Sequence, residues 1–312
     1  MTHITAIVRH RGPLIRAAAC IALAGTLAAA APSFADPQPE EDASSGTDAS
    51  AGAATTPAAS TDAPAAAPKG DVHDAQNPIA KLISIPVQFN SYHDVGPYGG
   101  TENLLLVEPV VPFKLNDDWN LITRTIIPFL WQPQLSPTLH AQYELGNINP
   151  QLYFSPSHSG QVIWGVGPEF SIPTATGIDR YAWSNHVGYG IDSVVLTFQG
   201  HWTLGLLASN LWTKTEHQIN GRTEKALTVN PFVYYNLPKG WYFVYSGVTT
   251  ADWQAPSKDR WTVPLGGGMG RLFKLGSQLI NARAQFLNNV ERPAYAPSWQ
   301  AQLQIQFLFP RH

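Results

Sequence analysis

The chain has one cysteine, Cys20, and few charged residues, 13% against roughly 25% in a typical globular domain. Beyond the N-terminus there is no run of about 18 apolar residues, so the sequence predicts no transmembrane helix in the mature protein. The formal net charge of −3 provides no basic surface, so we expect no nucleic-acid partner. These absences argue against a helical membrane protein and a nucleic-acid-binding protein.

The N-terminus, residues 1–35, is typical of a secretory signal peptide. A basic stretch containing Arg9, Arg11 and Arg16 precedes the small and apolar run 17–31, and Ala35 offers a cleavage point before Asp36. Cleavage there removes Cys20, so the mature chain has no cysteine that could mispair in the oxidising periplasm. Modification of Cys20 as a lipoprotein is a weak alternative, because alanines precede it.

The following segment, 36–76, consists mainly of Ala, Pro, Ser, Thr, Asp and Gly and contains no aromatic residue. Such a composition cannot bury enough apolar surface to offset the entropy lost on ordering. We therefore expect a disordered periplasmic tether, and its Ser/Thr/Pro stretches leave O-glycosylation open.

The last segment, 299–309, carries the clearest structural pattern. Its odd positions are Trp, Ala, Leu, Ile, Phe and Phe, and every even position from Gln300 to Gln306 is glutamine. Because successive side chains of a strand point to opposite faces, this strand has one apolar face and one amide face. Lipid outside and a wet lumen inside satisfy both faces, which predicts a transmembrane β-barrel. Such a closing strand resembles the C-terminal signal of bacterial outer-membrane proteins, and the resemblance implies recognition by the barrel-assembly machinery.

The same alternation recurs in about twelve segments after residue 80, each long enough to cross a bilayer at a tilt. Short turns rich in Gly, Pro, Asn and Asp alternate with longer connections, which indicates short periplasmic turns and longer outer loops. Tryptophans lie near the predicted strand ends, as in an interfacial girdle: Trp119, Trp131, Trp202, Trp212, Trp241, Trp261 and Trp299. The predicted fold class is all-β, an antiparallel transmembrane barrel of about twelve strands over 77–312, behind the signal peptide and the tether.

Prolines within the predicted strands oppose this interpretation, because proline cannot donate to a β-ladder. We expect them near strand ends or at bulges. They are Pro86, Pro109, Pro128, Pro150, Pro168, Pro231 and Pro264.

The candidate site consists of polar side chains on the predicted inward faces. Ionisable groups at membrane depth should face a wet lumen and pair with one another. The pore-lining candidates are Glu108, Arg124, Asn149, Gln151, Glu169, Asp192, Arg283, Gln285, Gln302 and Gln304. We expect Arg124 and Arg283 to oppose the carboxylates across the lumen, either as a structural network or as a constriction that selects solutes.

Catalytic, cofactor and metal sites find no support in the sequence. There is no Gly-x-Ser-x-Gly elbow, and the histidines His93, His140, His158, His186, His201 and His217 are scattered without metal-ligand spacing. The glycines of 266–270 precede no helical pattern, so we expect them to let a strand bend or to make room in the lumen rather than to bind phosphate.

Several longer motifs resemble a known family. They lie at 77–86, 110–113, 115–128, 164–168 and 172–176. They are similar to the outer-membrane family named after the MetA pathway of phenol degradation, over about 77–310. The resemblance implies a bacterial outer-membrane location and passage of an aromatic or hydrocarbon compound.

We therefore expect an outer-membrane channel for passive passage of small solutes, in contact with outer-membrane lipids. A non-conducting scaffold or surface-exposed binding barrel is the alternative, and an outer-membrane hydrolase is a weaker one.

Overall fold

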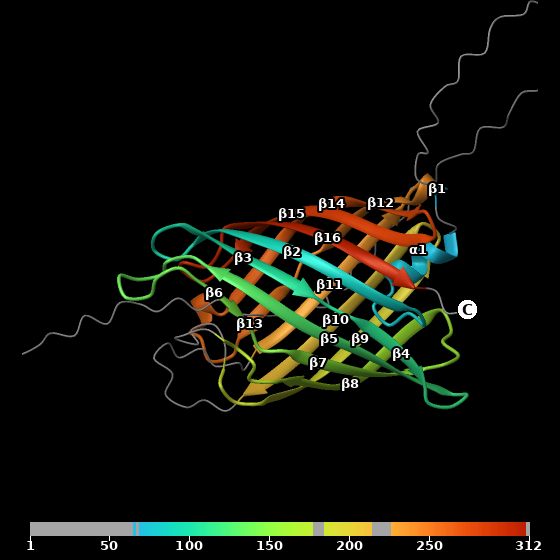
Figure 1. Cartoon of the computed structure of the whole chain (residues 1–312), viewed down its shortest axis with the longest axis horizontal. Coiled ribbons are helices and arrows are strands. Elements are labelled where there is room, and N and C mark those ends of the chain that lie inside the picture. The colour runs from blue at the N-terminus through green and yellow to red at the C-terminus, as the bar shows by residue number, and fades with distance from the viewer. Residues whose placement is uncertain (1–64, 67–68, 177–183, 214–225, 310–312) are drawn as a thin grey trace, which may run out of the picture. The chain divides into compact units, whose positions relative to one another are not determined.

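A computed structural model describes residues 65–66, 69–176, 184–213 and 226–309 (Figure 1). All of these belong to one of the two compact units into which the chain divides. The predicted signal peptide, its cleavage point and most of the predicted tether lie outside the described residues.

The described chain forms a closed antiparallel barrel of 12 strands, as the alternation predicts. In chain order the labelled strands are β2 (Ile83–Val95), β3 (Gly100–Val107), β4 (Val110–Lys114), β5 (Trp119–Gln132), β6 (Gln142–Leu145), β7 (Asn149–Pro156), β8 (Val162–Ser171), β9 (Gly188–Gln199), β10 (Trp202–Thr213), β11 (Ala226–Asn236), β12 (Trp241–Ser246), β13 (Thr249–Asp252), β14 (Trp261–Leu275), β15 (Gln278–Glu291) and β16 (Trp299–Phe309). The pairs β3/β4, β6/β7 and β12/β13 are each one barrel strand interrupted once, and the ring closes where β16 pairs with β2.

The remaining elements are short. They are β1 (Ala65–Ala66), the helix α1 (Lys69–Gln76) and the 3₁₀ turns η1 (Pro238–Gly240) and η2 (Ser257–Asp259). None of the helices in the described ranges has the length and apolar character needed to span a bilayer.

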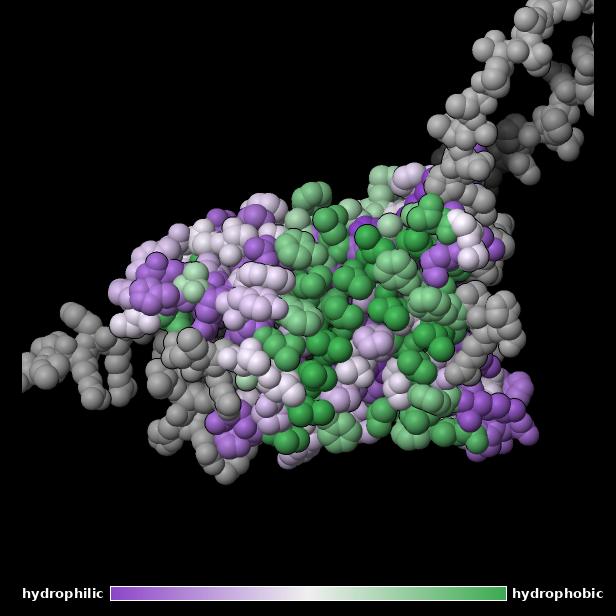
Figure 2. Space-filling view, viewed as in Figure 1, coloured by the Kyte–Doolittle hydropathy of each residue, from purple (hydrophilic) through white to green (hydrophobic). Residues whose placement is uncertain are grey.

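The outer surface carries an apolar belt, which appears as a green band in Figure 2. In β16, Leu303 and Ile305 are 56% and 49% exposed, whereas Gln302 and Gln306 are buried on the inner face. The girdle tryptophans stand at or next to strand ends; for example, Trp202 opens β10 and Trp212 lies near its end. The inside-outside assignment read from the sequence therefore holds in β16.

The prolines explain why some strands are interrupted. Pro109 lies between β3 and β4, and Pro264 follows a register shift between β14 and β15. Pro86, Pro128 and Pro231 lie inside strands, contrary to expectation, but each faces an interruption of the neighbouring strand. Because proline offers no N–H, the ladder stops opposite it and resumes beyond it.

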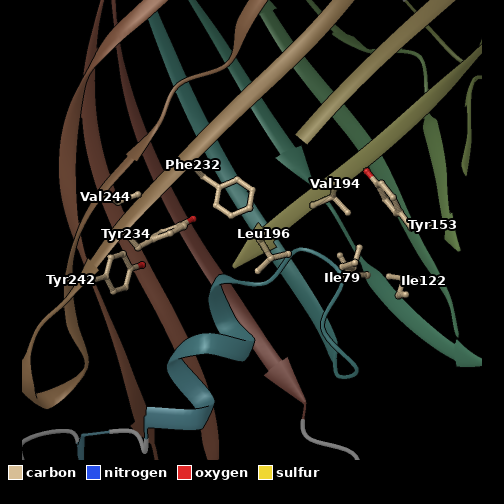
Figure 3. Packing of buried hydrophobic residues seen from close by; sticks show 10 residues of the cluster. Ile79, Ile122, Tyr153, Val194, Leu196, Phe232, Tyr234, Tyr242 and Val244 are labelled. Atoms are coloured by element: carbon tan, nitrogen blue, oxygen red, sulfur yellow. The ribbon is translucent and has the colours of Figure 1, made fainter. Parts of the chain in front are cut away.

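The N-terminal part of the described chain corrects one expected boundary. The predicted disordered segment extends to residue 76, but Lys69–Gln76 forms α1. Figure 1 shows α1 at one end of the barrel, and Figure 3 shows this helix and Ile79 after it close to the strands. Val72, Ala75 and Ile79 follow helical spacing at the start of the ordered chain, and all three are buried. Burial of these apolar side chains stabilises a short helix that would be marginal alone.

We name residues 69–82 the floor segment, because it contacts strands on opposite sides of the lumen. One side of α1 packs against β14, β15 and β16, through Val72 and Ala75 against Leu272, Leu279 and Leu308. On the other side His73 stacks on Phe198 of β9, with ring centroids 4.3 Å apart. Further along, Ile79 joins a hydrophobic cluster with Ile122 of β5 and Tyr153 of β7 (Figure 3).

Glycines on the inner face make room for this cluster. A Cβ at Gly205 would lie 2.2 Å from the ring of Phe232, and one at Gly270 would lie 2.3 Å from the ring of Tyr242. Phe232 and Tyr242 are both buried in the lumen cluster. Gly270 thus has the space-making role expected of the glycines in 266–270.

The lipid-facing and lumen-facing positions of β16 give a matched test. We expect Leu303→Arg to cost roughly 2–4 kcal/mol near the bilayer midplane, and Gln304→Arg to cost much less because its side chain reaches the water-accessible lumen. Folding titrations into lipid vesicles would compare these neighbouring positions on one strand. Equal costs at both would contradict the inside-outside assignment.

Candidate functional site

The barrel lumen contains a chamber of about 310 Å³ above the floor segment. Its base includes Ala75, Gln76, Asn77 and Pro78. Of the residues proposed from sequence, the following line it: Glu108, Arg124, Gln151, Glu169, Asp192, Arg283, Gln302 and Gln304. Asn149 and Gln285 are not among its lining residues and instead hold residues that are.

One wall carries an acidic cluster, which we define as Glu108, Arg124, Glu169 and Asp192. Arg124 Nη2 lies 2.6 Å from Glu108 Oε2 in a salt bridge. Asn149 Nδ2 donates to Glu169 Oε1 at 2.9 Å. All three carboxylate side chains are buried, so their hydrogen bonds with neighbouring residues offset part of the cost of desolvation.

Strand register assembles this cluster. Arg124 of β5 is directly paired with Gln151 of β7, which is directly paired with Glu169 of β8. Directly paired residues point to the same face of an antiparallel sheet. Gln151 therefore bridges the two charged residues, accepting from Arg124 Nη1 at 3.4 Å and donating to Glu169 at 3.4 Å.

Tyr153 ties Asp192 into the same wall. Its hydroxyl donates to Asp192 Oδ2 at 2.6 Å, while its ring packs in the hydrophobic cluster above the floor segment. Tyr153 thus connects the acidic cluster to the apolar cluster below it.

The opposite wall carries the Arg283 group, which we define as Arg283, Tyr234 and Gln88. Arg283 Nη1 donates to the Tyr234 hydroxyl at 2.9 Å, and Nη2 donates to Gln88 Oε1 at 3.1 Å. Around the ring, five strands separate β15 from β8 in either direction. They are β16, β2, β3, β5 and β7 on one side and β14, β12, β11, β10 and β9 on the other. Arg283 therefore comes from the strand diametrically opposite the strand of Glu169.

This arrangement corrects the expected opposition of charges. Arg283 lies across the ring from Glu169, as expected, and Asp192 is on the next strand. Glu108 lies between β3 and β4, on the third barrel strand from β15, and Arg124 is bound to Glu108 rather than opposed to it. The periodicity of single strands identifies inward residues but does not tell which strands become neighbours. The β4–β5 and β5–β7 pairings determine which strands, and therefore which charged residues, become neighbours.

Amide side chains connect the strands near Arg283. Gln302 donates to Asn90 at 2.8 Å and accepts a short hydrogen bond from Gln285. Gln285 is nearly fully buried and also bonds the backbone N–H and C=O of Ser246. The glutamine face of β16 is therefore part of a hydrogen-bonded inner wall, to which Gln285 of β15 contributes from the same face.

Several site residues are absent from the candidates predicted from sequence. Tyr153, Tyr234 and Gln88 occupy inward positions that alternation identifies, but alternation alone does not tell which inward side chains bond to the charged groups. Gln76 lay in the segment expected to be disordered. It donates to Asn236 and accepts from Thr203, both at 2.7 Å. The helical spacing of Val72, Ala75 and Ile79 is the signal that could have found it.

The nearest approach to a hydrolytic array lies on the outer face, away from the chamber. Ser91 Oγ is 3.1 Å from His93 Nε2, and Thr101 Oγ1 is 3.4 Å from His93 Nδ1. A threonine hydroxyl at that distance does not stabilise an imidazolium as a carboxylate would. The ring of His93 also stacks on Trp299, with centroids 3.8 Å apart. This geometry does not support a hydrolase, and no group of three or more candidate metal ligands occurs among the described residues.

No family model and no curated protein matches the chain, so the resemblance to the phenol-degradation family is not confirmed. Solved structures are similar to it to different degrees. An outer membrane channel from Pseudomonas putida F1 is similar with a TM-score of 0.56 and 13% identity, covering 73% of this chain and 96% of that one. The CymD monoaromatic hydrocarbon channel gives 0.43 and 9%, covering 74% and 89%. Outer membrane phospholipase A from Escherichia coli gives 0.37 and 11%, covering 73% and 96%. At 13% identity the likeness to the Pseudomonas putida F1 channel shows the fold alone, that of an outer-membrane β-barrel.

The salt bridge in the acidic cluster gives a second prediction. We expect Arg124→Gln to cost about 3 kcal/mol, because Glu108 would stay in the wall beside other carboxylates without its cation. The double variant Arg124→Gln/Glu108→Gln should recover most of that loss. Urea unfolding in lipid vesicles would measure both. A double variant as unstable as the single one would show that repulsion by the stranded Glu108 is not the cause.

Proposed function

We propose that the protein is a bacterial outer-membrane channel that lets small solutes pass through the barrel lumen without an energy source. The observation that carries this proposal is the chamber, a water-accessible space of about 310 Å³ lined by charged and amide side chains within a closed barrel. A side-chain network that served only to fill the barrel would leave no such space.

The chamber lining favours small polar or amphiphilic solutes. Its wall combines the acidic cluster, Arg283 and several glutamines with aliphatic side chains such as Leu106 and Leu207. A pure hydrocarbon would displace water from these polar groups without replacing its hydrogen bonds, which costs free energy. The aromatic solute implied by the family resemblance fits best when it carries a polar group.

The apolar belt supports an outer-membrane location, where lipid tails would contact side chains such as Leu303 and Ile305. The amphipathic β16 at the chain end suits recognition by the barrel-assembly machinery. Signal-peptide cleavage before Asp36 would be the first step on this route.

The floor segment is the main obstacle to passage, and it gives the alternative function its basis. It contacts strands around the ring and forms the base of the chamber. In this proposal a solute passes the base of the chamber when the segment moves. If it never moves, the barrel is a non-conducting scaffold.

Linking the floor segment to the wall tests the proposal. Gln76 on α1 and Thr203 on β10 are hydrogen-bonded neighbours, and the mature chain is expected to have no competing cysteine. We expect Gln76→Cys/Thr203→Cys, bridged by a short thiol-reactive cross-linker that reductant cleaves, to lose most of its conductance in planar bilayers. Conductance should return on reduction, because the floor segment would be free again.

The single variants Gln76→Cys and Thr203→Cys, treated with the same reagent, are the matched controls. Complete bridging without any change in conductance would show that the floor segment is not on the path. Absence of conductance from every variant and from the unmodified protein would favour the scaffold.

A further inference from the structure

Arg283 differs from the other cation of the chamber in how its charge is balanced. Arg124 has the carboxylate of Glu108 at 2.6 Å, whereas both hydrogen bonds of the Arg283 guanidinium go to uncharged oxygens. Its Nε is buried and has no hydrogen-bond partner among the residues that the structure describes. A charged group at membrane depth normally has a partner of opposite charge. The Arg283 guanidinium can therefore pair with an anion that enters the chamber.

The chemistry of a guanidinium favours a carboxylate as that anion. The planar group presents parallel N–H donors that match the two oxygens of a carboxylate. Tyr234 and Gln88 hold the guanidinium in place from two different strands, β11 and β2. A positioned donor loses less conformational entropy on binding than a free side chain.

The rest of the chamber has room and apolar surface for a small organic body. Its volume of about 310 Å³ lies at the lower end of the range of small-molecule sites, roughly 300–1,000 Å³. Aliphatic side chains on its wall include Leu106, Ile126, Leu207 and Val248. Leu106 is directly paired with Gln88, so apolar surface begins next to the Arg283 group.

The acidic cluster on the opposite wall limits the number of charges that such a ligand can carry. Glu169 comes from the strand diametrically opposite Arg283, and Asp192 lies on the next strand, β9. A second carboxylate pointing away from Arg283 would approach these two like charges. Like charges brought together in a partly desolvated site cost free energy, which gives discrimination by repulsion.

We propose that the Arg283 group binds a small monocarboxylate anion with an apolar body, and that the acidic cluster excludes the corresponding dicarboxylate. This inference rests on the proposed channel function, because it names the solute class that the channel would select. The carboxylate would accept hydrogen bonds from the guanidinium while the apolar body lies against the aliphatic wall.

Direct binding to the refolded barrel tests this proposal without relying on conduction. The probes are benzoate, its neutral analogue benzamide and the dicarboxylate terephthalate, measured by calorimetry on the full-length mature protein in detergent micelles. We expect benzoate to bind at least about tenfold more tightly than either analogue, a difference of about 1.4 kcal/mol. Equal binding of benzoate and benzamide would overturn the carboxylate assignment, and equal binding of terephthalate would overturn the role of the acidic cluster.

Substitution of Arg283 locates the site. Arg283→Gln should weaken benzoate binding by at least about tenfold. Arg283→Lys should retain part of the benzoate affinity, because it keeps the positive charge but lacks the parallel N–H donors of the guanidinium. Lys274→Gln removes a cation from an exposed position of β14 and should leave binding unchanged. A difference in migration between boiled and unboiled protein on a denaturing gel would establish that each variant has folded.

Unchanged benzoate affinity in folded Arg283→Gln and Arg283→Lys would overturn the site. The same probes in planar bilayers separate the two proposals. Benzoate binding by a protein that never conducts would overturn the channel and keep the site. Conduction that benzoate does not impede, together with no binding in micelles, would overturn the site and keep the channel.

Discussion

The closure of the antiparallel ladder into a ring is the constraint on which the rest of this structure depends. In lipid each backbone N–H and C=O needs a partner within the protein, and a closed barrel provides one without leaving an exposed edge. The pairing of β16 with β2 completes that ring. Once it is closed, every strand has one face toward lipid and one toward the lumen. In β16 the odd-numbered Leu303 therefore faces lipid and the even-numbered Gln304 faces the lumen.

Closure also explains why the prolines are tolerated. In a ring each strand has two neighbours, so a missing donor interrupts a ladder on one side only. The interruptions opposite Pro86, Pro128 and Pro231 divide a neighbouring strand in two, while the ladder on the other side of β2 continues past Pro86. The barrel stays closed because each proline removes ladder hydrogen bonds on only one side of its strand.

The lumen combines two different interiors. Near the floor segment it is packed with apolar side chains such as Ile79, Leu196 and Phe232, as in a soluble core. Above them it holds a polar chamber with Glu169 and Asp192 on the wall opposite Arg283. Tyr153 connects the two, since its ring belongs to the apolar cluster and its hydroxyl to Asp192. The apolar part forms the base of the chamber. The polar part places carboxylates and a guanidinium on walls that face each other.

The sequence by itself determined the strand count, the inward and outward faces and the inward orientation of residues such as Glu108 and Arg283, because a two-residue period depends only on local backbone geometry. It did not determine that Arg124 would lie beside Glu108 or that Arg283 would lie across the ring, because strand neighbours follow from register and ring closure. It also missed α1, because eight residues with few apolar side chains form a stable helix only when the lumen supplies the surface that buries Val72 and Ala75. These long-range contacts exist only in the folded barrel, so the tertiary structure alone decided the chamber and its floor.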